Sequence, residues 1–468
     1  MALLHQKSPE CTLAELDLAN DAAVGLINYP LNTIFSQCDV ILGDRLISQS
    51  SATHPYRAMI ETLLNYSEDT LKSQFSAGLF YKDTAGAVNS IVTNNGPNRG
   101  LNSRAAFSAN SREVDLFGPL HGDVFFCERL LLNSVDMRIK LTRASDAFCL
   151  MGARDSAFRL RILGASLFVK KVTVSPAIRL GHAAALQRGN ALYPLSRVNV
   201  KTYSIPANSR ICNQENLFLG AMPKYVVLGM VHHEAFTGRR DLSPFNFIHN
   251  SVEYMALCKD GRQVPAKAFQ PQFNQGSSVR EFYNMFIATG RHLKDLPLSI
   301  SRDEFNHGYS LFVFNLNPTD DSDALSPVSN GNLRLEMRFR VALPHTTTLI
   351  VYACYDSILE INSKRQLPLL TRSFDTPVYF IVNTHPADQP GDWGLIAQTG
   401  KALQPSPSLQ SLIIRGKRID HMGQVDSKAE LIIHVVYYVQ MTLLMRNISQ
   451  SSVFSILRFT PPLGSCTT

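Results

Sequence analysis

The sequence predicts an all-β protein in which two antiparallel β-sandwiches follow one another along the chain. Residues 136–143 and 333–341 both alternate apolar and charged side chains, and each is followed by a loop and a second, more apolar run. Alternation with a period of two places Met137, Ile139 and Leu141 on one buried face of a strand. The same hairpin-like ending therefore closes two consecutive domains, and turn signals between the other apolar runs favour sandwiches or jelly rolls.

Two-residue turns that contain glycine separate short apolar runs. Gly43-Asp44 and Asp260-Gly261 each stand between two such runs, and Asn330-Gly331 leads into the second alternating strand in the same way. These pairs supply the positive φ angles that tight hairpins need. Further strands are expected at residues 158–162, 166–174, 224–231, 310–316 and 348–355.

Short helices are expected as insertions between the strands. Residues 55–66 carry Met59, Ile60 and Leu63 on one face and a proline at the first turn, where proline is tolerated. A second short helix is expected at residues 278–286. Both segments lie inside β-rich stretches, so they decorate the sandwiches.

The organisation along the chain suggests three parts. A first sandwich is expected at residues 1–175 and a second at residues 176–361, with a linking segment at residues 175–194. Residues 362–468 form a C-terminal extension in which the apolar runs have no clear period, so no fold is predicted there.

Composition favours a folded structural protein over a nucleic-acid-binding one. The formal net charge is +7, but the basic residues are scattered and no run of five or more occurs, so only non-specific contact with DNA is expected. The eight cysteines are dispersed without any CxxC pair, as in a protein with reduced thiols.

No secretion signal or membrane span is predicted. The first ten residues lack the long apolar core of a signal peptide. The most apolar stretch, residues 431–445, is interrupted by His434, Gln440 and Thr442, whereas a span needs roughly 18 to 20 apolar residues. This stretch is expected to form a buried strand or a strand pair.

A search for chemical motifs predicts no catalytic, cofactor-binding or metal-binding residues. His232-His233-Glu234 is the first candidate for zinc, but adjacent histidines on a strand point to opposite faces and no second pair accompanies them, so a polar turn is the preferred interpretation. The phosphate-binding pattern GxGxxG and the hydrolase pattern GxSxG are both absent from the sequence.

Several long segments resemble a known family in collinear order from residue 1 to about residue 361. They resemble the hexon-type major capsid protein of Polinton/Maverick elements and the related adintoviruses. The segments are residues 31–40, 54–66, 79–86, 146–151, 213–220 and 244–247.

The resemblance implies a double jelly roll, with two eight-stranded sandwiches in one chain, and a trimer that forms a pseudo-hexagonal capsomer. It implies contacts with sister copies in the homotrimer, with neighbouring capsomers, and with penton and minor capsid proteins. It also implies a place in the virion capsid, or in the nucleus or cytoplasm of a host cell that expresses an integrated element.

Two departures from this family affect the expectation. Relatives place a further segment of several strands between an opening like residues 10–18 and a stretch like residues 22–28, whereas here the two nearly abut. The first jelly roll is therefore expected to lack its leading strands, which would expose sheet edges and apolar core. A chain with such exposed surfaces is expected to assemble poorly or not at all.

The second departure lies in the C-terminal extension. Residues 377–393 are similar to the beginning of the adenovirus-type cysteine protease carried by the same elements, but Asp392 stands where a histidine normally precedes Trp393. Cys466 lacks the family's surrounding sequence. A cysteine nucleophile needs an imidazole to take its proton, so activity is not expected. Chance similarity of one apolar strand is the alternative explanation of this short match.

The sequence thus predicts a structural protein that is not an enzyme. Two alternatives stay open: a cysteine protease-like C-terminal region, and a jelly-roll binding module adopted by a host. Thiol-dependent proteolysis would indicate the first, and a monomer with measurable ligand affinity would indicate the second.

Overall fold

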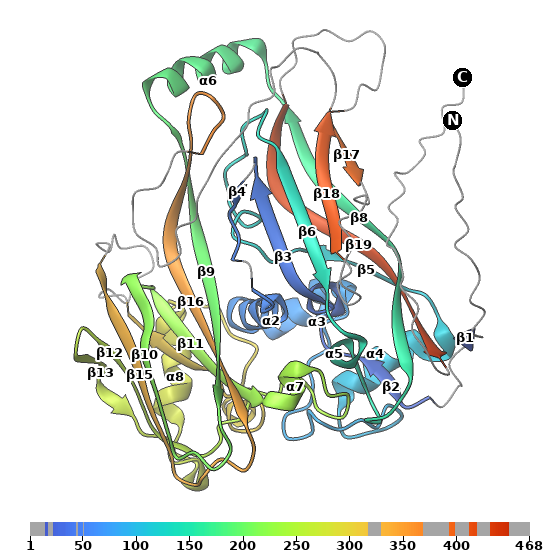
Figure 1. Ribbon diagram of the computed structural model, residues 1–468, viewed down its shortest axis with the longest axis vertical. Coiled ribbons are helices and arrows are strands. Elements are labelled where there is room, and N and C mark those ends of the chain that lie inside the picture. The colour runs from blue at the N-terminus through green and yellow to red at the C-terminus, as the bar shows by residue number, and fades with distance from the viewer. Residues whose placement is uncertain are drawn as a thin grey trace.

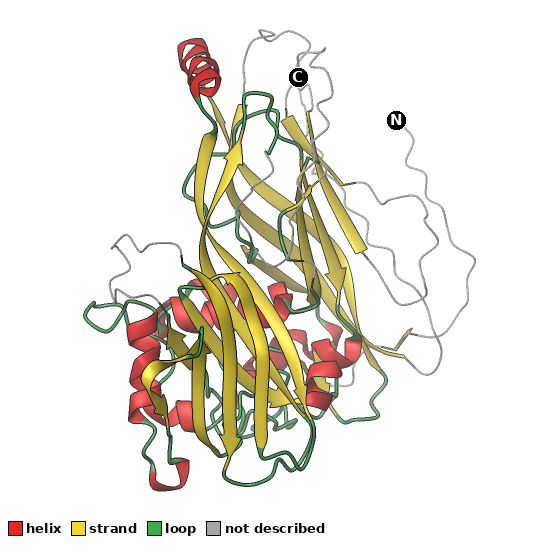
Figure 2. Ribbon diagram, turned by 60° about the vertical axis from the view of Figure 1, so that its left-hand side comes forward, coloured by secondary structure: helices red, strands yellow, loops and turns green. Residues whose placement is uncertain are grey.

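The computed structural model describes residues 15–16, 22–43, 45–49, 51–316, 329–367, 393–397, 411–418 and 431–448. These residues form two β-sandwiches that stand side by side, with helices between and around them (Figure 1). Figure 2 shows that one helix, α6 (Pro176–Arg188), projects from the body at one end of the molecule.

The second sandwich consists of two antiparallel sheets with the strand orders β9-β16-β11-β14 and β10-β15-β12-β13. Numbered 1 to 8 along the chain, these orders are 1-8-3-6 and 2-7-4-5. This is the order of a jelly roll, in which two Greek keys enclose one core. The strands are β9 (Ala191–Ile205), β10 (Ile211–Ala221), β11 (Tyr225–His232), β12 (Val252–Lys259), β13 (Arg262–Phe269), β14 (Phe312–Asn315), β15 (Asn330–Phe339) and β16 (Thr347–Ile361).

The first sandwich has one sheet with the order β8-β19-β5 and one with the order β17-β18-β6-β3-β4. A short strand, β1, pairs with the end of β19, and β2 and β7 form a separate two-stranded sheet. The strands are β1 (Glu15–Leu16), β2 (Val24–Leu26), β3 (Phe35–Leu42), β4 (Arg45–Leu46), β5 (Val114–Pro119), β6 (Met137–Arg143), β7 (Leu150–Gly152), β8 (Phe158–Thr173), β17 (Trp393–Ala397), β18 (Ser411–Arg418) and β19 (Leu431–Ile448).

The first sandwich repeats the strand order of the second. In the numbering of the second sandwich, β18, β6, β3 and β4 hold positions 2-7-4-5, and β8, β19 and β5 hold positions 8, 3 and 6. Position 1, beside the outer edge of β8, is not filled by any strand of the described residues. The all-β, double jelly-roll fold expected from the sequence is therefore the observed one, and strands that follow the second jelly roll in the chain hold two places in the first.

The helices of the described residues are short and lie between and around the sandwiches. They are α1 (Pro30–Thr33), α2 (His54–Asn65), α3 (Glu68–Lys72), α4 (Arg99–Ser108), α5 (Asp146–Cys149), α6, α7 (His233–Thr237), α8 (Val279–Ala288) and α9 (Arg302–Asn306). Single 3-10 turns occur at Gln74–Gly78, Ala109–Ser111 and Phe273–Gln275. The helix α2 lies between the two sandwiches (Figure 1). Within the described residues, no helix is long and apolar enough to cross a membrane.

The duplicated ending predicted from the sequence is confirmed. The two alternating segments are β6 and β15, which both hold position 7 of their sandwiches. Met137, Ile139 and Leu141 are buried as the alternation requires. Each of these strands leads to the long strand at position 8 of its sandwich, which is β8 after β6 and β16 after β15. Both lie in the opposite sheet, β8 at its edge and β16 between β9 and β11.

Most local predictions are confirmed, and two need correction. The helices expected at 55–66 and 278–286 are α2 and α8, and residues 431–445 belong to one long strand. The two runs expected at 158–162 and 166–174 are a single strand, β8. The division into residues 1–175, 176–361 and 362–468 stays a prediction, although β18 and β19 pair with strands of the first part.

The turn predicted at Asn330-Gly331 is wrong. Both residues lie inside β15, where they pair with Ala221 and Gly220. A Cβ atom on Gly331 would lie only 2.4 Å from a carboxylate oxygen of Asp260. Glycine is needed at this position because Asp260 packs closely against the backbone, and not because the chain reverses direction there. At Gly43 and at Asp260-Gly261 the positive φ angles confirm the predicted turns.

Candidate functional site

The two sandwiches meet around a pocket of about 490 Å³ whose wall contains a cluster of buried charges. The cluster consists of Arg57 and Glu61 from α2, and His121 and Asp123 from the loop after β5. Tyr352, from β16 of the second sandwich, completes it. All five side chains are buried, so their pairing determines whether the junction is stable.

Arg57 connects the two carboxylates of the cluster. Its Nε donates to Glu61 Oε1 at 2.9 Å, and its Nη2 lies 2.7 Å from Asp123 Oδ1. Arg57 and Glu61 are four residues apart, so one face of α2 presents both. The second sandwich binds the same carboxylates, because Tyr352 donates to Glu61 at 3.4 Å and the Val198 amide donates to Asp123 at 3.2 Å.

The cluster keeps Glu61 ionised although it is buried. Burial raises the pKa of Glu61, but the Arg57 charge and the hydrogen bond from His121 outweigh burial and lower the pKa from 4.5 to about 2. His121 Nδ1 lies 2.6 Å from Glu61 Oε2 and donates to it. The pKa of the neighbouring His54 falls from 6.5 to about 3, because of burial and of the charges of His121 and Arg57.

A second set of contacts joins the first sandwich to β9. The side chain of Gln49 donates to the Val200 carbonyl at 3.0 Å and accepts from the Val200 amide at 2.6 Å. Arg197 donates to the Ile47 carbonyl at 2.7 Å. These contacts satisfy backbone groups of β9 from the other sandwich, so they fix the position of β9 along the junction.

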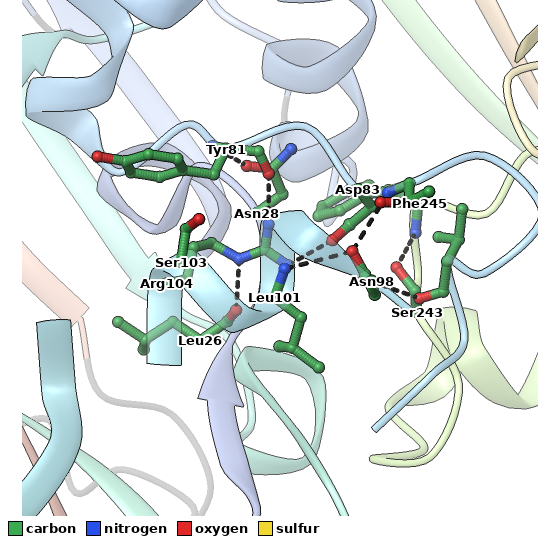
Figure 3. Close-up of polar contacts among 12 residues, drawn as sticks. Leu26, Asn28, Tyr81, Asp83, Asn98, Leu101, Ser103, Arg104, Ser243 and Phe245 are labelled. Atoms are coloured by element: carbon green, nitrogen blue, oxygen red, sulfur yellow. Dashed lines mark hydrogen bonds and ion pairs between the residues drawn. The ribbon is translucent and has the colours of Figure 1, made fainter. Parts of the chain in front are cut away.

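A fully buried ion pair forms a third part of the junction (Figure 3). Arg104 of α4 has no exposed surface, and its Nη2 lies 2.7 Å from Asp83 Oδ1. Its Nε donates to the Leu26 carbonyl at 2.8 Å, and its Nη1 donates to the Tyr81 carbonyl. Tyr309 of the second sandwich donates to the Asp83 carbonyl at 2.7 Å. The pair thereby ties β2, α4 and the loop around Asp83 to the second sandwich.

These arrangements hold the two sandwiches in one relative position. Each charge described above points at an opposite charge or at a hydrogen-bonding group across a strand or helix boundary. Buried ion pairs of this kind favour one arrangement over alternatives, because a displaced partner would leave a charge without compensation. The junction is therefore suited to defining the shape of the subunit.

The histidine pair noted in the sequence lies away from this junction. His232 ends β11, accepts from the Glu234 amide at 3.1 Å, and stacks on His345 with ring centroids 3.9 Å apart. His233 instead lies 2.9 Å from the Thr348 hydroxyl, and Glu234 pairs with Arg239. The structure thus does not bring the three residues together. No group of three or more His, Cys, Asp or Glu side chains in the described part of the chain could hold a metal ion.

The segment similar to a cysteine protease is described only where it ends. Residues 377–392 and Cys466 lie outside the described residues, and Trp393 begins β17, which pairs with β18 in the first sandwich. The six cysteines that the structure describes are buried free thiols. Burial raises the pKa of Cys38, Cys149 and Cys354 to about 12. Thiols of this kind are poor nucleophiles at neutral pH.

Among the large apolar side chains that are exposed in the described residues, two groups are each close together in the fold. The first lies on α6 and the adjoining ends of β9 and β16, where Leu180 is the most exposed member at 73%. The second lies on and after α8, where Leu293 is 85% exposed. The α6 group is Ile178, Leu180, Leu192 and Ile358, and the α8 group is Val279, Tyr283, Leu293 and Leu296.

The charged cluster could not have been found as a site from the sequence alone. The spacing of Arg57 and Glu61 inside a predicted helix is a visible signal for an ion pair. Asp123, His121 and Tyr352 carry no such signal, because only the packing of two sandwiches brings them to α2.

Comparisons with known proteins give distant matches. No family model matches the chain. An uncharacterized protein of Caenorhabditis elegans, F54H12.2, is 22% identical over 347 residues, which cover 72% of this chain and 80% of that protein.

Three solved structures are similar at low identity. The PBCV-1 VP54 structure fitted into a reconstruction of the virophage Sputnik has a TM-score of 0.45 and 12% identity, and covers 74% of this chain and 88% of its own. The Sputnik virophage structure has a TM-score of 0.40 and 11% identity, and the match covers 76% of this chain and 78% of the Sputnik chain. The Faustovirus major capsid protein has a TM-score of 0.37 and 8% identity, and the match covers 72% of this chain and 73% of the Faustovirus chain. The strand order of the two sandwiches, rather than these distant likenesses, identifies the fold.

Proposed function

We propose that this chain is a structural subunit of a viral or virus-like icosahedral capsid, in which three copies form a pseudo-hexagonal capsomer. One observation carries the proposal: two jelly rolls of the same strand order stand side by side in one chain. Three such chains around an axis present six similar sandwiches, which approximates a hexagon with only three subunits. The buried junction supports this function, because a capsomer needs subunits of one defined shape.

The exposed apolar groups are the surfaces that association would cover. The α6 group and the α8 group both contain large side chains that are exposed in a single copy. Contiguous apolar patches on a protein surface commonly mark protein–protein contacts. We therefore assign these two groups to contacts between sister copies or between neighbouring capsomers.

Other partners and the location follow from the same proposal. Penton and minor capsid proteins would meet the outer rim of the capsomer, and the net charge of +7 would permit non-specific contact with packaged DNA. The protein would reside in the virion capsid, or in the nucleus or cytoplasm of a cell that expresses it. No step of this function requires bond-making chemistry.

Size-exclusion chromatography with multi-angle light scattering on the full chain tests the proposal. The expected result is a particle with the mass of three chains at micromolar concentration, and negative-stain images with pseudo-hexagonal outlines. A folded monomer over the whole concentration range would contradict capsomer formation and would favour a binding module instead.

A further inference from the structure

The strands at positions 2 and 3 of the two jelly rolls come from different places in the chain. In the second jelly roll they are β10 and β11. Along the chain these two strands come after β9 at position 1 and before β12 at position 4. In the first jelly roll they are β18 and β19, which follow the entire second jelly roll. Positions 4 to 8 of the first jelly roll are filled in sequence order by β3, β4, β5, β6 and β8.

The strand β19 is an integral part of its sheet. It lies between β5 and β8, and the register runs from Tyr438↔Pro119 to Leu443↔Val114 on one side and along nearly the whole of β8 on the other. Without β19, these two neighbours would have no partner between them. The first jelly roll therefore contains a strand-binding site, and residues 431–448 occupy it.

The two faces of β19 carry the side chains that their surroundings require, apolar toward the core and polar toward water. Val439, Met441 and Leu443 alternate along the strand and are at most 2% exposed, whereas Gln440 is exposed. The Thr442 hydroxyl donates to Asp115 of β5 at 2.5 Å. A shift of the register by one residue would turn these buried apolar side chains toward water, so the register of β19 is strongly specified.

The end of β19 lies beside the part of the chain that leads into position 4. Glu15 pairs with Ile448 and Leu16 pairs with Asn447. The next long strand of the chain is β3, which holds position 4. If β18 and β19 were placed between residues 18 and 22, β19 would precede β3 with only β2 and α1 between them, and positions 3 and 4 would follow one another in the same order as in the second jelly roll.

We propose that β18 and β19 are the displaced strands of positions 2 and 3 of the first jelly roll, so that the chain is a rearranged double jelly roll that fills these two positions with its own later segment. This explains why residues 10–18 and 22–28 nearly abut although the sandwich has strands at positions 2 and 3. The occupant of the strand-binding site is the β18–β19 segment of the same copy. The proposal concerns folding and does not depend on capsid assembly.

A cross-linking experiment on the full chain tests the occupant. Phe117 and Gln440 are register partners on β5 and β19, and both side chains are exposed. Cysteines at paired positions of an antiparallel sheet are within disulfide range. The variant carries Phe117→Cys and Gln440→Cys with Cys11→Ser and Cys466→Ser. The expected product after oxidation is a cross-link inside one chain, seen as a shifted monomer band without reductant.

A matched control separates pairing from chance oxidation. Ile211→Cys with Gln440→Cys places the first cysteine on the exposed surface of β10 in the second jelly roll, and no cross-link is expected. Absence of the Phe117–Gln440 cross-link, or a cross-link that joins only different copies, would overturn the proposal.

A rearranged chain tests the strand order. Residues 393–448 are moved between residues 18 and 22 with short Gly/Ser linkers at both junctions. The rearrangement removes the need to close a loop as long as the second jelly roll, so the variant is expected to keep the cross-link and to melt at the same temperature or higher. Loss of the cross-link, in a variant whose second jelly roll is folded by hydrogen exchange, would contradict the proposed order.

Discussion

At the scale of residues, the junction is unusual because its buried side chains are charged. Arg57 is held by two carboxylates, and each carboxylate also receives a hydrogen bond from the second sandwich. Such a cluster stabilises the folded state only while every member is present, since a single deletion leaves a buried charge without compensation.

Replacement of Glu61 tests this dependence. Glu61→Gln removes the charge that faces both Arg57 and His121, and we expect a loss of about 3 to 5 kcal/mol in unfolding free energy. The measurement is urea denaturation followed by near-ultraviolet circular dichroism. Glu253→Gln on the exposed face of β12 is the control and should change stability by less than about 0.5 kcal/mol. An equal effect of both variants would rule out a special role for the cluster.

The buried His54 predicts a pH dependence of stability. Its pKa is 6.5 as an ordinary side chain and about 3 in the folded protein, so between these values the unfolded chain binds the proton more readily. Stability is therefore complete above pH 6.5 and falls by up to about 1.4 kcal/mol per pH unit as the pH decreases toward 3. Ionised Glu61 adds to this loss below pH 4.5, because its folded pKa is also lowered.

Thermal melts from pH 7 to pH 5 must compare the wild type with a variant at His54, because burial also lowers the pKa of His232, His249 and His345. His54→Gln should flatten the curve of melting temperature against pH. An unchanged slope in His54→Gln would show that other groups cause the pH dependence.

At the scale of elements, β19 determines whether the sheet formed by β8, β19 and β5 is continuous. It is central in its sheet, and its partners β5 and β8 do not pair with each other among the described strands. The second jelly roll contains no strand from this part of the chain. The two sandwiches should therefore respond differently to damage in β19.

A charge at a buried position of β19 tests this difference. Met441 is fully buried, so Met441→Asp should cost about 4 kcal/mol or more and release β19. Hydrogen exchange should then show loss of protection in β5 and β8, with β11 and β16 still protected. Gln440→Asp, one residue away on the exposed face, should keep all four strands protected. Loss of protection in both sandwiches at once would mean that they unfold as one unit.

At the scale of the whole molecule, the exposed apolar groups remain available to other copies. Among the residues that the structure describes, Leu180 on α6 and Leu293 after α8 are the most exposed large apolar side chains. Their position on the outside of a rigid pair of sandwiches suits the proposed capsomer, in which association would remove them from water.

Charged substitutions at these positions should weaken association without unfolding the subunit. Leu180→Glu or Leu293→Glu is expected to raise the concentration at which trimers form by tenfold or more, since burying an unpaired carboxylate opposes association. Light scattering across a dilution series measures this effect, and the melting temperature at low concentration should stay unchanged. Gln187→Glu on α6 serves as the control for added charge on the same helix. Normal trimers in both leucine variants would place the subunit contacts elsewhere.

The spacing of apolar residues in the sequence was sufficient to predict those strands and helices whose pattern is contained in a short segment. Alternation in residues 136–143 and 333–341 predicts β6 and β15, and the apolar face of residues 55–66 predicts α2. Strand and helix periods depend on backbone geometry alone, so these elements can be read before any tertiary contact is known. The correspondence of β6 and β15 also indicated a duplicated sandwich.

The sequence by itself thus determined the fold class and the duplication, whereas the interruption between residues 18 and 22 stays an expectation from the family resemblance. Only the tertiary structure decided that β18 and β19 fill places in the first jelly roll, and that Asp123 and Tyr352 meet Arg57 and Glu61. The physical reason is that strand pairing and ion pairing between distant segments depend on which surfaces remain to be covered after each sandwich closes. That information is carried by the packed molecule and not by the spacing of residues along the chain.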